Sequence, residues 1–313
     1  MKKWLKRFFY FLFSLFLVVN IICAFQAYHF TRFYDNVVYK NPAQMGFFEK
    51  TGAALFGMPI PKGKVVDSFH APHTNITIHT NDGFHLKGWE AKQSPAKGTI
   101  LLFHGHGGNK SGVIREAESF YALGWNTVLV DFRAHGESTG NECSVGYEEA
   151  KDVKAVYDYV KTGGENNIVL WGISMGAATI TKAINDYSDL TPWKVILEMP
   201  FGTMQQAVEG RVKLMGLPAE PAGAMLTFWG GTELGVWAFS NKPEEYAKKI
   251  TVPVLLQWGR NDTRVTEFET NAIFKNLPGK QKELVIYEKC SHESLCKKEH
   301  EKWVQNISAF LAK

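Results

Sequence analysis

The sequence has few cysteines, little net charge and no basic stripe. Its 313 residues include four cysteines, which form no C-x-x-C pair and show no zinc-finger spacing. This excludes a zinc domain or a thioredoxin-like redox motif. Because the net charge is only +4 and no stripe of Lys and Arg with interleaved aromatics occurs, we expect no nucleic-acid binding. Repeats and low-complexity tracts are also absent, and 45% hydrophobic with 21% charged residues is a globular composition.

The four cysteines leave one question open. Cys290 and Cys296 are six residues apart and would form a disulfide in an oxidising compartment. The sequence favours the alternative, in which all four behave as free, small hydrophobic residues.

The chain begins with a long apolar segment. Residues 8–31 contain no charged side chain, and residues 8–27 are dominated by Phe, Leu, Val and Ile, while four basic residues lie among the first seven. A helix of this length crosses the roughly 30 Å of a bilayer core. We therefore expect residues 1–31 to form a single-pass membrane anchor with the catalytic domain on the non-cytoplasmic side. A cleaved signal peptide is the alternative, although no A-x-A site follows.

Residues 32–64 are rich in Gly and Pro and are interpreted as an irregular connecting segment. Its aromatic residues either lie near the membrane surface or line the following domain. We place that domain at residues 65–313.

From residue 65 onward, short apolar runs alternate with segments of helical spacing. Strands are predicted at 75–79, 84–91, 99–103, 126–130, 168–171, 194–198, 254–258 and 283–287, and helices at 111–123, 145–162, 175–187, 265–276 and 300–312. This order predicts an α/β fold, in which helices cover both faces of a mostly parallel sheet that starts with an antiparallel hairpin.

The sequence I-V-L-W-G-I-S-M-G-A-A at residues 168–178 reads as strand, sharp turn and helix. G-x-S-x-G in that setting is typical of a nucleophile elbow, where Ser174 would project its hydroxyl from the end of the sheet. The alternative is a buried turn serine, which only partner residues elsewhere can exclude.

Two candidate partners follow later strands. Asp262 comes after the strand at 254–258, and His292 comes after the strand at 283–287. Because the carboxyl ends of parallel strands converge on one edge, these side chains can meet Ser174 there. His292 would act as the general base and Asp262 would orient it. Asp262 as a turn residue and His292 as a loop residue are the alternatives, and Glu198 is the reserve acid.

The glycine-rich loop H-G-H-G-G-N follows the strand at 99–103. The backbone N–H groups of His106 and Met175 are the expected donors to an oxyanion. His104 and His106 resemble a metal pair, but no third ligand lies nearby in the sequence, so we expect no metal and no organic cofactor.

At this point the sequence resembles the α/β-hydrolase superfamily, in particular its serine-hydrolase branch of membrane-anchored acyl hydrolases and serine aminopeptidase-like members. The resemblance covers about 65–313 and rests on H-G-H-G-G-N, D-F-R-A-H-G-E-S at 131–138, G-I-S-M-G, G-R-N-D and the final S-H. It implies a structural role for the segment at Asp131, in which Ala134 replaces a usual glycine. A serine nucleophile also argues against the epoxide-hydrolase and dehalogenase branches.

Some fifty residues, 201–250, separate two predicted strands and are long enough for a helical cap over the active-site edge. Large apolar residues are frequent here. We predict a substrate pocket lined by Phe201, Met204, Phe228 and Trp229, and the alternative is packing of the same residues on the domain.

The sequence thus predicts a serine hydrolase that cleaves carboxylic esters, including lipid-like acyl esters, through an acyl-serine intermediate. A peptidase or amidase of the same fold is one alternative, although no acidic cluster to capture a substrate amino group is evident. A binding protein that retains the elbow without turnover is the other.

Overall fold

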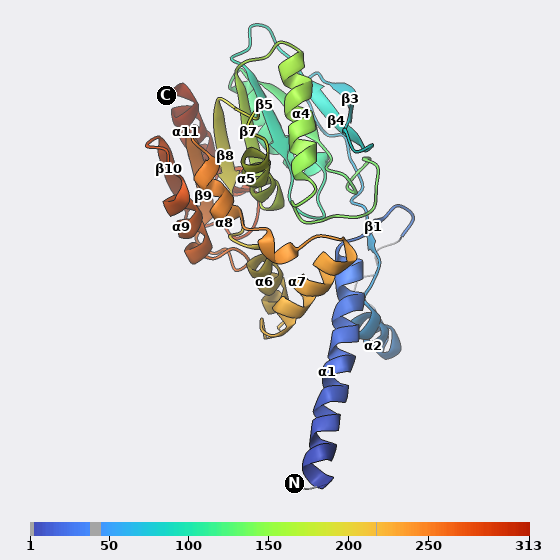
Figure 1. Cartoon of the computed structure of the whole chain (residues 1–313). Coiled ribbons are helices and arrows are strands. Elements are labelled where there is room, and N and C mark those ends of the chain that lie inside the picture. The colour runs from blue at the N-terminus through green and yellow to red at the C-terminus, as the bar shows by residue number, and fades with distance from the viewer. Residues whose placement is uncertain (1–2, 38–44, 217) are drawn as a thin grey trace.

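Eight strands form one sheet in the order β10-β9-β8-β7-β5-β6-β4-β3 (Figure 1). The computed structural model describes residues 3–37, 45–216 and 218–313. The strands are β3 (Thr74–His79), β4 (His85–Ala91), β5 (Thr99–Phe103), β6 (Asn126–Val130), β7 (Ile168–Ile173), β8 (Lys194–Glu198), β9 (Val254–Gly259) and β10 (Lys282–Tyr287). All eight predicted strands are therefore present.

The six strands from β5 to β10 are parallel, and β4 is antiparallel to both β6 and β3. Every residue of β5 and of β8 is buried, as expected for parallel strands covered on both faces. The predicted mostly parallel sheet with an antiparallel hairpin is confirmed.

Helices cover both faces of the sheet. On one face α4 (Ala150–Thr162), α5 (Met175–Asp186), α8 (Pro243–Tyr246) and α9 (Glu267–Asn276) pack in a row. On the other lie α3 (Ile114–Ala122), α10 (Leu295–Lys298) and α11 (His300–Ala312), with the short 3-10 helix η2 (Lys110–Val113) leading into α3. Phe120 and Trp303 join α3 to α11, with ring centroids 5.1 Å apart.

The helix α4 begins at residue 150, five residues later than predicted. Val145 and Gly146 have positive φ values of 52° and 92°, which a right-handed helix does not allow. The carboxylate of Glu149 instead accepts the backbone N–H groups of Ser144 and Gly146. Because of this buried turn, α4 begins only at residue 150.

The N-terminal segment is the long helix α1 (Lys3–Phe30), which projects away from the sheet domain (dark blue in Figure 1). Most of its side chains are exposed, while its carboxyl-terminal end packs against α7 and α2. The prediction of an irregular connecting segment is wrong in part. The helix α2 (Phe47–Phe56) lies beside α1, and β1 (Phe33–Tyr34) pairs with β2 (Ile60–Pro61); residues 38–44 lie outside the described residues.

The insert between β8 and β9 is helical, as predicted. It contains α6 (Met204–Leu214), α7 (Ala222–Glu233), α8 and the 3-10 helices η3 (Ala238–Ser240) and η4 (Ala247–Lys249). The helices α6 and α7 pack on each other and, in Figure 1, lie between the sheet and the upper part of α1. This arrangement brings the insert, the N-terminal helix and the carboxyl ends of the strands together.

Candidate active site

Ser174 occupies the turn between β7 and α5 with φ 54° and ψ −116°, a strained conformation for a residue with a side chain. The flanking glycines are required by close packing. A Cβ on Gly172 would lie 2.6 Å from the backbone of Gly176, and one on Gly176 would lie 2.2 Å from the carbonyl oxygen of Phe103. The local geometry is that of a nucleophile elbow.

The structure brings the three candidate side chains together. His292 Nε2 lies 2.9 Å from Ser174 Oγ, and His292 Nδ1 lies 2.7 Å from Asp262 Oδ2. Both distances are within hydrogen-bond reach. One continuous hydrogen-bonded chain therefore runs from hydroxyl to imidazole to carboxylate, although the residues come from three separate loops.

Backbone hydrogen bonds hold the Asp262 carboxylate in place independently of His292. Its Oδ1 accepts the backbone N–H groups of Arg264 at 2.8 Å and Val265 at 2.9 Å. The side chain is fully buried, and Oδ2 accepts from His292. Asp262 thus shapes its own turn and also orients the imidazole, so the two interpretations of this residue are compatible.

Glu198, the reserve acid, has other partners. Its Oε1 accepts hydrogen bonds from the side chains of Trp171, Trp303 and Gln257 at 3.0, 2.6 and 3.1 Å. Burial, and secondly the nearby carboxyl of Glu116, raise the pKa of Glu198 to about 8. A carboxyl group that stays protonated near neutral pH cannot stabilise an imidazolium ion, so Asp262 fits that role better.

His106 and Met175 line the same cavity as Ser174 and His292. Their loops are in contact with the elbow, since a Cβ on Gly105 would lie 3.5 Å from the Cβ of Ser174. The two predicted oxyanion donors are therefore next to the nucleophile.

The His106 side chain has partners that the sequence did not indicate. Its ring stacks on Phe30, the last residue of α1, with centroids 4.7 Å apart and planes at 11°. Arg211 of α6 donates from Nη2 to His106 Nδ1 at 3.2 Å. Burial, and secondly the charge of Arg211, hold the pKa of His106 well below its usual value, so the imidazole is neutral.

His104 stabilises the glycine-rich loop through two hydrogen bonds. Its Nε2 accepts the backbone N–H of Phe132 at 3.1 Å, so Nδ1 carries the proton and donates to the carbonyl of Gly105 at 2.7 Å. Burial lowers the pKa of His104 to about 4. Each of the two histidines in this loop therefore hydrogen-bonds to neighbouring protein groups, and the two rings are not arranged as ligands of one metal ion.

The cavity beside Ser174 is small, about 30 Å³. Its lining residues are His106, Val145, Ser174, Met175, Phe201, Ala207, Arg211, Arg264, Val265 and His292.

Of the four predicted pocket residues, one lines the cavity at Ser174 and the other three do not. Phe201 lies in the cavity wall, whereas Met204 is buried in the hydrophobic core and does not line the cavity. Trp229 instead donates from Nε1 to Asn20 of α1 at 3.2 Å, and Phe228 is 43% exposed. Both sit on α7, which packs against α1, so this helix presents part of its apolar surface to the N-terminal helix rather than to the cavity.

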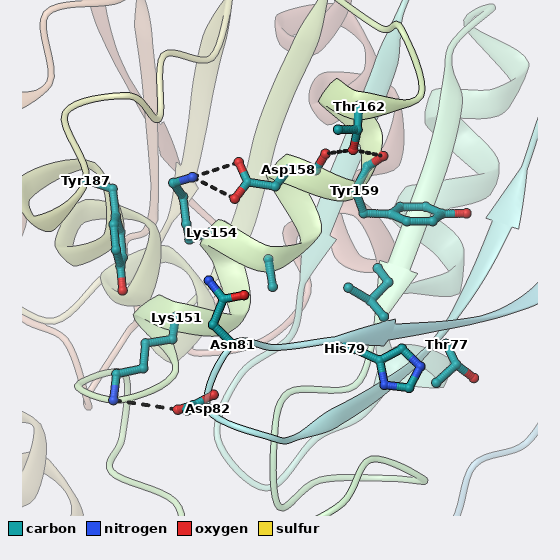
Figure 2. Close-up of a pocket in the computed structure, with 12 residues that line it drawn as sticks. Thr77, His79, Asn81, Asp82, Lys151, Lys154, Asp158, Tyr159, Thr162 and Tyr187 are labelled. Atoms are coloured by element: carbon teal, nitrogen blue, oxygen red, sulfur yellow. Dashed lines mark hydrogen bonds and ion pairs between the residues drawn. The ribbon is translucent and has the colours of Figure 1, made fainter.

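A larger cavity of about 530 Å³ lies elsewhere, between the β3–β4 hairpin and α4 (Figure 2). It shares no lining residue with the cavity at Ser174. Lys151 and Lys154 point across it, but they pair with Asp82 and Asp158 respectively. Its charged side chains pair with one another, and the hydroxyls of Thr77 and Thr162 bond to Lys87 and to backbone carbonyls instead of a histidine. We therefore place the functional site at Ser174.

The segment that starts at Asp131 is structural. Asp131 accepts both the backbone N–H and the Nζ of Lys110, at 2.7 and 2.6 Å, and Arg133 pairs with Asp152 at 2.6 Å. Ala134, which replaces the usual glycine, has φ 64°. The backbone therefore keeps the left-handed conformation that a glycine would adopt more easily.

Parts of the chain are similar in sequence to known proteins. Residues 94–228 match the family model of serine aminopeptidases (Hydrolase_4, S33). An uncharacterized Bacillus subtilis protein, YqkD, is 26% identical over 241 residues, which cover 76% of this chain and 79% of that protein. The mouse lysophosphatidylserine lipase ABHD12 is 25% identical over 177 residues, 52% of this chain but only 41% of the lipase.

Solved structures share the fold. The Pyrococcus furiosus esterase Pf2001 superposes with a TM-score of 0.67 at 23% identity, covering 80% of this chain and 96% of the esterase. A bacterial membrane phospholipase A gives a TM-score of 0.54 at 20% identity, covering 77% and 86%. The fold is that of the α/β-hydrolases, and the matched family model and relatives indicate a hydrolase.

Proposed function

We propose that the protein is a membrane-bound serine hydrolase that cleaves carboxylic esters, including lipid-like acyl esters, with Ser174 as the nucleophile. The observation that carries the proposal is the hydrogen-bonded chain Ser174–His292–Asp262 at an elbow. The proposed mechanism needs no metal or organic cofactor, because the nucleophile is activated by a base within the chain.

In this mechanism His292 Nε2 takes the proton from Ser174 Oγ while Oγ forms a bond to the carbonyl carbon. The negative charge on the carbonyl oxygen is held by the backbone N–H groups of Met175 and His106. When the C–O bond to the alcohol breaks, His292 returns its proton to the leaving oxygen. Water then attacks the acyl-serine with the same base, and the acid product and the free hydroxyl of Ser174 result.

The cavity supports an ester rather than an aminopeptide substrate. An aminopeptidase holds the substrate's positive amino group, which calls for a carboxylate in the pocket. Among the described residues that line this cavity, none is Asp or Glu, and two are arginines. Together with the named activities of the lipase and esterase relatives, this favours the esterase over the peptidase or amidase.

The N-terminal helix supports a membrane location. α1 has 28 residues and a mean hydropathy of 2.5 in its most apolar window, of which 6% is buried within the protein. At 1.5 Å per residue it is about 42 Å long, more than a bilayer core needs. Lys3, Lys6 and Arg7 precede its apolar part, which would leave the catalytic domain on the non-cytoplasmic side.

A second apolar surface lies beside the anchor. The helix α2 exposes Phe47 and Phe48, at 78% and 87%, and Gln26 of α1 donates to the carbonyl of Ala53 in α2. Because this helix is continuous with the apolar surface of α1, we place it at the membrane interface. The active site, next to the end of α1, would then face the lipid.

The proposed activity is tested by turnover of p-nitrophenyl acyl esters set beside aminoacyl anilides, for the parent protein and for Ser174→Ala. We expect ester hydrolysis by the parent, slower anilide hydrolysis, and neither by the variant. Faster anilide turnover would favour the peptidase. A folded parent protein that turns over neither class would point to a binding protein that retains the elbow.

A further inference from the structure

Arg211 lies beside the catalytic serine in an unusual electrostatic setting. It is largely enclosed by α6, α1 and the His106 loop, with its guanidinium 4.8 Å from the centre of the Phe30 ring. One of its nitrogens, Nη2, donates to His106 Nδ1 at 3.2 Å. An arginine has five N–H donors, so most of its hydrogen-bonding capacity is left over.

Arg211 has no carboxylate partner among the described residues. Arg32, Arg133 and Arg260 of the same protein each form an ion pair of 2.6–3.0 Å, whereas Arg211 and Arg264 form none within 4.0 Å across 3–37, 45–216 and 218–313. A half-buried cation without a counter-charge costs free energy, and an apolar side chain of similar volume would avoid that cost. The arrangement therefore calls for a reason outside folding.

Arg264 adds a second positive charge beside the same cavity. Arg264 lines the same cavity and its backbone lies against α6, since a Cβ on Gly210 would lie 2.5 Å from the Arg264 carbonyl oxygen. Burial, and secondly the charge of Arg264, lower the pKa of Arg211 to about 10. The carboxylate of Asp262, which contacts the lining residue His292, already uses both oxygens on Arg264 N–H, Val265 N–H and His292.

Support of His106 alone would not require this arrangement. One neutral donor is enough to hold the Nδ1 of a neutral imidazole, and an exposed second arginine adds nothing to that hydrogen bond. Two arginines that line one cavity are, by contrast, suited to a phosphate or a carboxylate, which accepts paired N–H bonds and neutralises both charges.

We propose that Arg211 and Arg264 form an anion-binding subsite beside Ser174, and that the enzyme selects esters that carry a phosphate or carboxylate group close to the scissile bond. This inference rests on the proposed esterase function. Arg211, the half-buried member, contributes the larger part of the selectivity, and the exposed Arg264 contributes less because water screens its charge.

The test compares two matched substrate pairs on the purified full-length protein in non-ionic detergent micelles. Oleoyl lysophosphatidic acid against oleoylglycerol places a phosphate on the alcohol side, and mono-p-nitrophenyl glutarate against p-nitrophenyl valerate places a carboxylate on the acyl side. The variants are Arg211→Gln and Arg264→Gln, with Arg260→Gln as control. Arg260 lies on the same loop as Asp262 but is exposed, pairs with Glu267 and Glu288, and does not line the cavity.

We expect the ratio of kcat/KM for the anionic over the neutral ester to fall roughly 10- to 100-fold in Arg211→Gln and roughly two- to fivefold in Arg264→Gln. Arg260→Gln should leave the ratio unchanged. The pair that shows the effect identifies the anion as phosphate or carboxylate. If both arginine variants slow the anionic and neutral esters equally, Arg211 only supports His106 and the subsite proposal is wrong, while the esterase function stands.

A binding measurement tests the anion-binding subsite independently of catalysis. The Ser174→Ala variant should bind oleoyl lysophosphatidic acid more tightly than oleoylglycerol in the same micelles, and the added Arg211→Gln substitution should abolish that preference. Equal affinity for all four ligands without turnover would overturn the subsite whatever the fate of the proposed reaction.

Discussion

Phe30, the last residue of the N-terminal helix, stacks face to face on His106, the residue whose backbone N–H is expected to hold the oxyanion. The helix that would anchor the protein thereby contacts a residue that lines the candidate active site. A chain cut before the sheet domain would lose this contact together with the packing of α1 on α7. The N-terminal helix and the His106 loop therefore pack against each other.

The stacking contact predicts an effect of Phe30→Ala on catalysis. Loss of the ring leaves His106 less firmly placed, and an aromatic pair is worth about 0.5–1.5 kcal/mol, so we expect kcat to fall roughly three- to tenfold. The measurement is ester turnover in detergent micelles. Phe25→Ala is the matched control, because Phe25 contacts Phe56 of α2 edge to face instead, and it should leave kcat near that of the parent. An equal loss in both variants would indicate general damage to α1.

Asp262→Asn tests the orientation of the base. The asparagine carbonyl can still accept the backbone N–H groups of Arg264 and Val265, but its NH₂ group cannot accept the proton on His292 Nδ1. We expect kcat to fall by roughly 10³–10⁴ with little change in the thermal midpoint. Glu198→Gln, which changes the reserve acid, should keep most of the activity. The reverse order of losses would assign the orienting role to Glu198.

Glu198 also predicts a pH dependence of stability. Its folded pKa of about 8 lies above the ordinary value of 4.5, so the folded protein holds this proton over a pH range in which the unfolded chain has lost it. Stability from this group is complete below about pH 4.5 and declines as the pH rises to about 8. Glu198→Gln removes the titration while keeping an acceptor for Trp171 and Trp303. The variant's thermal midpoint should therefore drop less than the parent's between pH 6 and pH 9. Parallel declines would contradict the buried neutral carboxyl.

Close packing at the elbow predicts that Gly176 cannot be replaced by a residue with a side chain. In Gly176→Ala the new methyl group would lie 2.2 Å from the Phe103 carbonyl oxygen, which is backbone that cannot move aside without disturbing β5. We expect a loss of several kcal/mol in the free energy of unfolding, on the order of 3 kcal/mol. Gly112→Ala, where nothing lies within 4 Å, is the control and should be near neutral. Urea titration of both variants gives the comparison.

The membrane anchor is tested by cell fractionation. The full-length chain should remain with membranes after high-salt washing and be released by detergent, because α1 presents a long, exposed apolar surface. Recovery of a shortened soluble chain would instead identify residues 1–31 as a cleaved signal peptide.

The sheet and the triad geometry were readable from the sequence because they depend on local patterns. Continuous apolar runs such as 100–103 and 195–197 indicate strands buried on both faces. The placement of Ser174, Asp262 and His292 after successive parallel strands brings them to one edge of the sheet. The catalytic role of these residues stays a prediction.

The wall of the cavity was not readable because it comes from segments whose packing is decided by tertiary contacts. Hydrophobicity marked Phe228 and Trp229 as apolar but did not tell a pocket from a neighbouring helix, and Trp229 contacts α1. Arg211 sits in the insert without any local motif. The helix α2 was missed because the Gly and Pro residues around it indicated an irregular segment.

The most direct test of the account is labelling with a fluorophosphonate, which phosphonylates a serine that is activated by a neighbouring base. We predict that the parent protein is labelled, that peptide mapping places the label on Ser174, and that both Ser174→Ala and His292→Ala remain unlabelled while folded. A folded parent protein that resists the probe, or a label on another serine that persists in Ser174→Ala, would contradict the proposed catalytic centre.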